Sequence, residues 1–489
     1  MRLRYVLLVA LLNVGCGDDN NGFATKADCN PLGIERCMVP WPSSVYEIDD
    51  ATSKTGKRLD IPEGALPLNA EGDTTDPTIW NWADGFSPAA PIVVAFPGGV
   101  SAQGLPPVND MAVSLTAQSS TVLIDTTTNQ RVAHFAELDE QAADAPDSQA
   151  LFIRPAARLL GGHRYVVAIT NRVTAKDGSA LPRSAGFNAL LNGTVTNHAR
   201  LERMRATFPA LLEALAAVGV PKEDLVLAWD FTVASDEFLH SDMLKARERA
   251  LAALENHPIA FEIVSDTVDE ANEIKHTITG KFDAPLFLTN DGRPAARTVI
   301  ARDGAKLPIT SKFYRVPFTA IIPACAYTSA QPVGMVLYGH GLMGASNQVA
   351  SGAVRRTAAE LCMVVVGTDM RGMSEPDIGA IARALTNMTY ADEVFEVLEQ
   401  GLLNHITLSK AMRTTLATQL FTVDPDGAGP MPARSIVDPT KVFYYGLSQG
   451  GIFGTVVVAY DPFITRGVLG VGGANYSTLL ERSTDWPTY

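Results

Sequence analysis

Residues 442–457 of this chain read VFYYGLSQGGIFGTVV. The apolar run before Gly446 is typical of a buried strand, and the residues after Gly450 are typical of a helix. Ser448 stands between these two glycines, two positions from each. Glycines at that spacing permit a strained turn in which neighbouring side chains would collide. The stretch therefore predicts strand, tight turn and helix, with the Ser448 hydroxyl projecting into a cleft above a helix N-terminus that favours negative charge.

A second motif, GHGL at residues 339–342, follows an apolar strand expected at 335–338 and precedes the first long helix of this region. A serine hydroxyl is a poor nucleophile, so acyl transfer needs donors that hold the developing oxyanion. A loop in this place donates one backbone N–H, and the residue after the nucleophile donates the other. We therefore expect the amides of Leu342 and Gln449 to form an oxyanion hole.

The remaining residues of the GHGL motif are expected to shape this loop. They are Gly339, His340 and Gly341. In this motif a histidine ring normally braces the loop, and a role for His340 as a substitute base is the alternative reading.

The elbow, the GHGL loop and WDFT at residues 229–232 resemble secreted bacterial lipases and esterases of the α/β-hydrolase superfamily, especially virulence-factor-type lipases with an N-terminal sandwich. The likeness covers most of residues 60–475. It implies hydrolysis of ester or lipid substrates through an acyl-serine intermediate, with no cofactor and no metal. It also implies further strands after residues 468–471, bearing the catalytic acid and histidine.

No histidine follows Ser448, and the last of the eight histidines is His405. The α/β-hydrolase chain order places acid and then base after the serine. We therefore expect a truncated product of a longer hydrolase gene, or half of a split one. Without its base, the elbow should retain only the weak catalysis that the oxyanion hole and substrate binding supply.

Length and composition indicate a folded, multidomain protein. A chain of 489 residues with 46% hydrophobic and 19% charged residues is expected to form two or three domains. Its net charge of −14 would repel nucleic acid, which we exclude as a partner. The oligomeric state cannot be read from these features.

The N-terminus carries an export signal. Arg2 and Arg4 precede an apolar run at 5–12, and a small residue, Gly15, stands before Cys16. Residues 1–16 therefore read as a signal peptide with a lipobox-like end, in which lipidated Cys16 becomes the mature N-terminus. Ordinary signal cleavage is the alternative. Both place the protein outside the cytoplasm, either anchored by lipid to the membrane at the bacterial cell envelope or secreted.

The pattern of the rest of the chain predicts an Ig-like β-sandwich followed by an incomplete α/β-hydrolase domain with a doubly wound, mainly parallel sheet. Proline-rich residues before the sandwich suggest an extended arm. The expected boundaries are an arm at 17–90, the sandwich at 91–193, a helical connecting region at 194–265 and the hydrolase domain at 266–489.

Four cysteines remain if Cys16 is lipidated, and an exported protein can pair them. Cys29 and Cys37 are close in a loop-rich stretch and are the expected disulfide. Cys325 and Cys362 each flank a predicted core strand and either pair or remain buried thiols.

Three functions are compatible with these features. The leading hypothesis is an exported, lipid-anchored serine hydrolase acting on carboxylic esters, with Ser448 as nucleophile. A non-catalytic surface lipoprotein, whose Ig-like module binds a partner or glycan, is the alternative from another class. A peptidase is the third, because the GLSQGG sequence at 446–451 also suits peptidases.

Overall fold

A computed structural model describes residues 25–34, 36–269, 271–310, 312–423, 434–474, 479 and 482–484. The predicted signal peptide at 1–16, with Cys16, lies outside these described residues. The chain divides into two compact units: one comprises Met1–Ile48 with Pro91–Val233, and the other Asp49–Ala90 with Ala234–Tyr489. Each unit is described separately below.

The first unit contains two antiparallel sheets, one of three strands in the order β3-β7-β6 and one of four in the order β5-β4-β8-β9. Antiparallel strands agree with the short β-rich runs in the sequence, and assignment of the unit to the Ig class stays a prediction. The strands are β3 (Ile92–Ala95), β4 (Thr121–Asp125), β5 (Gln130–Arg131), β6 (His134–Leu138), β7 (Ala150–Pro155), β8 (Arg164–Thr170) and β9 (Leu225–Thr232).

Residues 194–265 are shared between the two units instead of forming a separate connecting region. The first unit takes α1 (Ala185–Asn192), α2 (Ala199–Arg205), α3 (Phe208–Ala217) and β9, which pairs with β8. The helices α2 and α3 are separate because Pro209, near the start of α3, has no N–H to continue a preceding helix but fits the first helical turn.

The second unit is built on a seven-stranded sheet in the order β10-β11-β12-β14-β13-β17-β18. The first three pairings are antiparallel and the last three are parallel. The sheet is therefore mixed, not mainly parallel as predicted. Its strands are β10 (Phe261–Val268), β11 (Ile274–Leu286), β12 (Lys312–Pro323), β13 (Val333–Gly339), β14 (Val364–Thr368), β17 (Val437–Leu447) and β18 (Gly467–Gly470).

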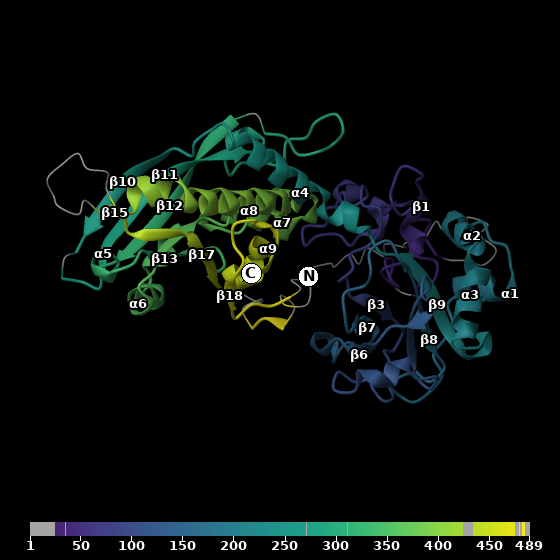
Figure 1. Ribbon diagram of the computed structural model, residues 1–489. Helices are drawn as coiled ribbons and strands as arrows, with labels where there is room; N and C mark the ends of the chain where they lie inside the picture. Colours follow the sequence, from purple (N-terminus) through teal and green to yellow (C-terminus); the bar gives the residue numbers. More distant parts are fainter. Residues whose placement is uncertain are drawn as a thin grey trace, which may run out of the picture. The chain divides into compact units, whose positions relative to one another are not determined.

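Helices cover both faces of this sheet, as the continuous apolar run of β14 predicts (Figure 1). Val364 and Val366 pack in a core cluster with side chains of α4, α8 and α9. Val365 points to the other face, where it packs with side chains of α6. The helices are α4 (Asp236–Ala253), α5 (Cys325–Thr328), α6 (Gly352–Leu361), α7 (Ile378–Thr386), α8 (Asp392–Arg413) and α9 (Gln449–Tyr460).

Two short two-stranded sheets, a π-helical turn and two disulfides also belong to the described fold. A short ladder joins β1 (Glu47–Asp49) to β2 (Lys57–Leu59), another joins β15 (Thr422–Val423) to β16 (Arg434–Ser435), and a π-helical turn follows α8 at Leu416–Leu420. Disulfides link Cys29 to Cys37 and Cys325 to Cys362. No helix in the described ranges is both long and apolar enough to cross a membrane.

Candidate active site

Ser448 occupies the sharp turn between β17 and α9. Its φ of 54° and ψ of −118° lie in a strained region for a residue with a side chain. Its backbone is nevertheless held on both sides, since its N–H donates to the Gly470 carbonyl at 3.0 Å and its carbonyl accepts from Gly451 N at 2.8 Å. The residue is exposed although Gln449 and Gly450 beside it are buried. The turn therefore presents the hydroxyl to solvent.

The two elbow glycines are required by close backbone packing. A Cβ at Gly446 would lie 2.1 Å from the Gly450 carbonyl oxygen, and one at Gly450 would lie 2.0 Å from the Gly339 carbonyl oxygen. Real Cβ atoms do not approach oxygen this closely, so the backbone itself would have to move. The second contact also shows that the end of β13 lies directly against the first turn of α9.

The backbone N–H groups at this junction differ in their hydrogen bonding. The Gly341 N–H donates to Gln348 Oε1 at 2.9 Å and the Met343 N–H donates to the Met373 carbonyl at 3.1 Å. Between them, the Leu342 N–H has no acceptor within the described part of the chain, and neither has the Gln449 N–H at the start of α9. These are the two amides expected from the sequence to form an oxyanion hole.

His340 is buried beneath this loop, with both ring nitrogens engaged. Nδ1 donates to the Gly341 carbonyl at 2.7 Å, and Nε2 accepts from Met370 N–H at 2.8 Å. Burial lowers the pKa of the ring and so favours the neutral form that this pattern requires. The ring braces the loop and has no nitrogen available to accept a proton from Ser448.

A turn at residues 371–374 supports both halves of the site. The Met373 carbonyl accepts from Met343 N–H and from Gln449 Nε2, the latter at 3.2 Å. The carboxylate of Asp377 fixes the turn by accepting from Gly372 N–H at 2.7 Å and Ser374 Oγ at 2.6 Å. No role is expected from the sequence for Met373 or Asp377, because nothing in their spacing signals one.

A general base for Ser448 is not found among the described residues. Within these ranges the Ser448 hydroxyl has no hydrogen-bond partner, and every histidine precedes it in the chain. His405, on α8, is fully buried; its Nδ1 donates to the Gly401 carbonyl at 2.8 Å, and its Nε2 has no partner among the described residues. Burial lowers its pKa to about 4. No group of three metal-ligating side chains is present in the described part of the chain either.

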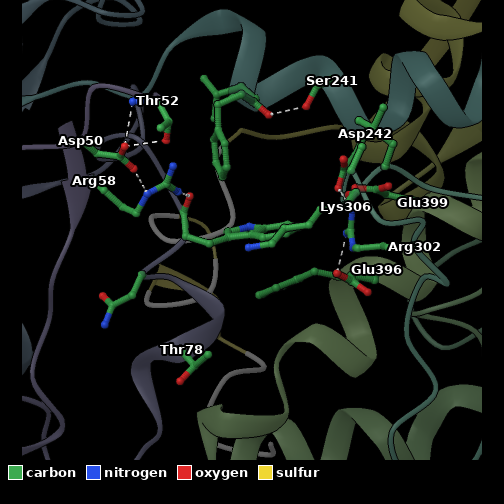
Figure 2. Close-up of a pocket in the computed structure, with 17 residues that line it drawn as sticks. Asp50, Thr52, Arg58, Thr78, Ser241, Asp242, Arg302, Lys306, Glu396 and Glu399 are labelled. Carbon is green, nitrogen blue, oxygen red and sulfur yellow. Dashed lines mark hydrogen bonds and ion pairs between the residues drawn. The ribbon is translucent and has the colours of Figure 1, made fainter. Parts of the chain in front are cut away.

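Two cavities of the second unit differ in their relation to this site. A cavity of about 840 Å³ contains none of the elbow or GHGL residues. Figure 2 shows that its wall is charged, with Arg302 held between Asp242 and Glu396 at 2.6 and 2.8 Å. A cavity of about 630 Å³ includes Met343, next to Leu342, in its wall. Of these two cavities, the smaller one alone has a chain neighbour of the GHGL loop in its wall.

No protein-family model and no curated protein matches this sequence. Solved structures similar to the chain include acetyl xylan esterase 1 from Thermoanaerobacterium sp. JW/SL YS485, with 14% identity, a TM-score of 0.30, and 52% of this chain and 65% of that chain covered. Acetyl xylan esterase from Paenibacillus sp. R4 has 15% identity and a TM-score of 0.26, and the match covers 47% of this chain and 58% of that chain. A CE15 glucuronoyl esterase from Teredinibacter turnerae T7901 has 14% identity and a TM-score of 0.23, and the match covers 44% of this chain and 46% of that chain.

The chain thus spans less than two thirds of the length of these three esterases. At such TM-scores the likeness does not decide fold or activity.

Proposed function

We propose that this protein is a serine hydrolase of carboxylic esters, with Ser448 as nucleophile and the Leu342 and Gln449 amides as oxyanion donors. One observation carries the proposal: an exposed serine is held at φ 54° directly before Gln449, whose N–H, like that of Leu342, has no acceptor among the described residues. Strain of this kind persists only where the surrounding structure enforces it, and it clusters at active sites. The buried ring of His340 and the glycine contacts supply that enforcement.

The chemistry follows from these positions. Ser448 Oγ would bond to the ester carbonyl carbon as its proton passes to a base, and the carbonyl oxygen would become an oxyanion held by the two amides. Collapse of this tetrahedral intermediate would release the alcohol, which takes up a proton, and leave an acyl-serine. Water would then hydrolyse the acyl-serine to the acid. The sequence has no histidine after Ser448. We therefore expect the chain by itself to react slowly.

Labelling by a fluorophosphonate probe tests this function. The probe should bond to Ser448, and the Ser448→Ala variant should stay unlabelled. Added imidazole should accelerate labelling of the wild type, because it supplies the base in solution. If neither the wild type nor the wild type with imidazole is labelled, the protein is not a serine hydrolase. The alternative function, a non-catalytic lipoprotein whose Ig-like module binds a partner or glycan, would then be favoured.

We further propose export and anchoring through lipid on Cys16. The support is the N-terminal sequence alone, with Arg2 and Arg4 before the apolar run and Gly15 before Cys16. Mass spectrometry of protein from bacterial membranes should find a lipidated N-terminal cysteine. Release of an unlipidated protein after cleavage elsewhere would contradict the anchor but not the export.

A further inference from the structure

The charged cavity of Figure 2 adjoins a smaller cavity of the same unit. Their volumes are about 840 and 370 Å³, and ligand sites typically measure roughly 300 to 1,000 Å³. Trp82 and Phe395 belong to the walls of both cavities. The two cavities together, the Trp82 site, are lined by side chains from residues 50–82, from α4 and α8, and from residues 302–307.

Aromatic side chains from three parts of the chain line the Trp82 site. They are Trp80 and Trp82, Phe238 of α4 and Phe395 of α8. Cation–π contacts hold the Trp82 ring, whose centroid lies 4.7 Å from Arg302 Cζ and 5.6 Å from Lys306 Nζ. Phe395 is 53% exposed although its side chain is large and apolar. The site therefore offers aromatic faces that a ligand can cover.

Ion pairs fix the polar part of the wall before any ligand binds. Arg58 pairs with Asp50, whose Oδ1 also accepts from Thr52 Oγ1 at 2.6 Å. Figure 2 shows this pair on one side of the cavity, and Arg302 with Glu396 on the other. Glu396 is held further, because its Oε2 accepts from the Ile300 N–H at 2.7 Å. Groups that are already in place cost less entropy to engage a ligand.

Glu399 is the carboxyl group of this wall that lacks a partner. Its Oε2 is buried and has no hydrogen bond to any described residue. Burial raises the pKa of Glu399 to about 8, and the nearby carboxylates of Asp242 and Glu396 add to the effect. The group is therefore mainly neutral at pH 7, and a neutral carboxyl group can both donate and accept a hydrogen bond.

The charges of the larger cavity balance when Glu399 is neutral. Its other ionic side chains are three cations and three carboxylates: Arg58, Arg302, Lys306, Asp50, Asp242 and Glu396. The smaller cavity adds only one further carboxyl group, Asp392, whose pKa is raised by burial. A strongly charged ligand of either sign therefore gains little. A purely apolar ligand would remove water from these ionic groups without replacing its hydrogen bonds.

We propose that the Trp82 site binds a neutral oligosaccharide. Aromatic faces can pack against the C–H faces of sugar rings, and the fixed carboxyl and guanidinium groups can bond to sugar hydroxyls, which donate and accept. Two adjoining cavities suit a ligand of more than one ring. The proposal does not depend on the proposed hydrolase function, because neither wall contains a residue of the elbow or of GHGL.

Calorimetric titration of the full chain with tetrasaccharides tests the site. We expect at least one of cellotetraose, xylotetraose and maltotetraose to bind. Phe395→Ala should weaken that binding by more than about tenfold, because it removes an exposed aromatic face. Leu361→Ala is the matched control, since Leu361 is 63% exposed on α6 and lies in neither wall. It should leave binding unchanged.

A pair of substitutions at Glu399 tests the polar contact separately. Glu399→Gln keeps a donor and an acceptor and should retain binding, whereas Glu399→Leu keeps neither and should weaken it. Thermal unfolding of both variants and of Phe395→Ala must show an intact fold. Equal binding by Glu399→Leu and the wild type would overturn the contact that the proposal assigns to this carboxyl group.

The remaining outcomes decide the ligand class. No binding of any neutral tetrasaccharide, or unchanged binding in Phe395→Ala, overturns the site. Tighter binding of anionic tetragalacturonate or of the cationic glucosamine tetramer than of all the neutral sugars overturns a neutral ligand. Fluorophosphonate labelling should be equal in Phe395→Ala and the wild type. Absence of labelling in both would overturn the hydrolase function while saccharide binding still supported the Trp82 site.

Discussion

The elbow and the cavity beside Met343 belong to the same unit, but different parts of the chain build them. At the elbow, backbone packs against backbone so closely that a single Cβ at Gly450 would lie 2.0 Å from a carbonyl oxygen. At the cavity, the wall consists of side chains, several of them exposed. The difference implies that the position of Ser448 is fixed by backbone packing, whereas the side chains of the cavity wall can change with little effect on stability.

Removing the hydroxyl should have the largest effect on reactivity. Ser448→Ala should abolish fluorophosphonate labelling while changing the free energy of unfolding little, because the side chain is exposed. Ser448→Gly should also abolish labelling but raise stability, by about 1 kcal/mol or more, because glycine adopts φ 54° without strain. Urea unfolding of the wild type and of the two variants measures these differences in stability. Equal stability of the alanine and glycine variants would contradict a strained turn.

A methyl group added at Gly450, where two backbone segments touch, should lower both the stability of the fold and the rate of labelling. Gly450→Ala should lower the free energy of unfolding by more than about 3 kcal/mol and slow labelling strongly, because the Gly339 strand end must move away. Gly352→Ala is the matched control, since a Cβ there meets nothing within 4 Å. A Gly450→Ala protein with wild-type stability would show that the two segments are not in contact.

Loss of the His340 ring, which braces the GHGL loop, should have an effect of intermediate size on the rate of labelling. His340→Ala leaves Gly341 O and Met370 N without their partners, so the Leu342 amide loses its fixed position. We expect labelling with imidazole present to slow on the order of tenfold to hundredfold. Imidazole should accelerate labelling of His340→Ala and of the wild type by a similar factor. A larger acceleration of the variant would mean that His340 acts as the base.

Acid should weaken the second unit through His405. Its pKa in the folded protein is about 4, below its ordinary value of 6.5, so between these values the unfolded chain binds a proton that the folded chain does not. Stability should therefore fall as pH decreases from about 6.5 to about 4, by roughly 1 to 3 kcal/mol for this group. His405→Leu should flatten that slope in urea unfolding. An unchanged slope would assign the acid sensitivity to other groups.

Changes in the cavity wall should have the smallest effect on stability. Leu385→Ala removes a side chain that is 44% exposed, so the free energy of unfolding should change by less than about 1 kcal/mol. Urea unfolding measures this change. A large loss of stability would reverse the comparison between the two regions.

The sequence predicted the elbow well because its requirement is local. The spacing of Gly446, Ser448 and Gly450 reports a backbone contact that no other residue permits. The whole motif occupies only five positions of the chain, residues 446–450.

Features decided by distant contacts were not predicted. β10 is exposed along nearly its whole length and lacks the alternation that identifies a strand, and β11 contains Gly280 and Pro285. Their antiparallel hairpin makes the sheet mixed. The role of residues 67–75 was missed for the same reason. The sequence indicated an extended arm, but its place beside α7 depends on hydrogen bonds to Asn387 and Thr389.

The most direct test of the central claim is a crystal structure of the protein after reaction with an alkyl fluorophosphonate in the presence of imidazole. We predict a covalent bond to Ser448 Oγ, with the phosphoryl oxygen about 2.7 to 3.1 Å from both the Leu342 and the Gln449 amide nitrogens. A phosphonyl group on another residue, or a phosphoryl oxygen turned away from these amides, would contradict the account.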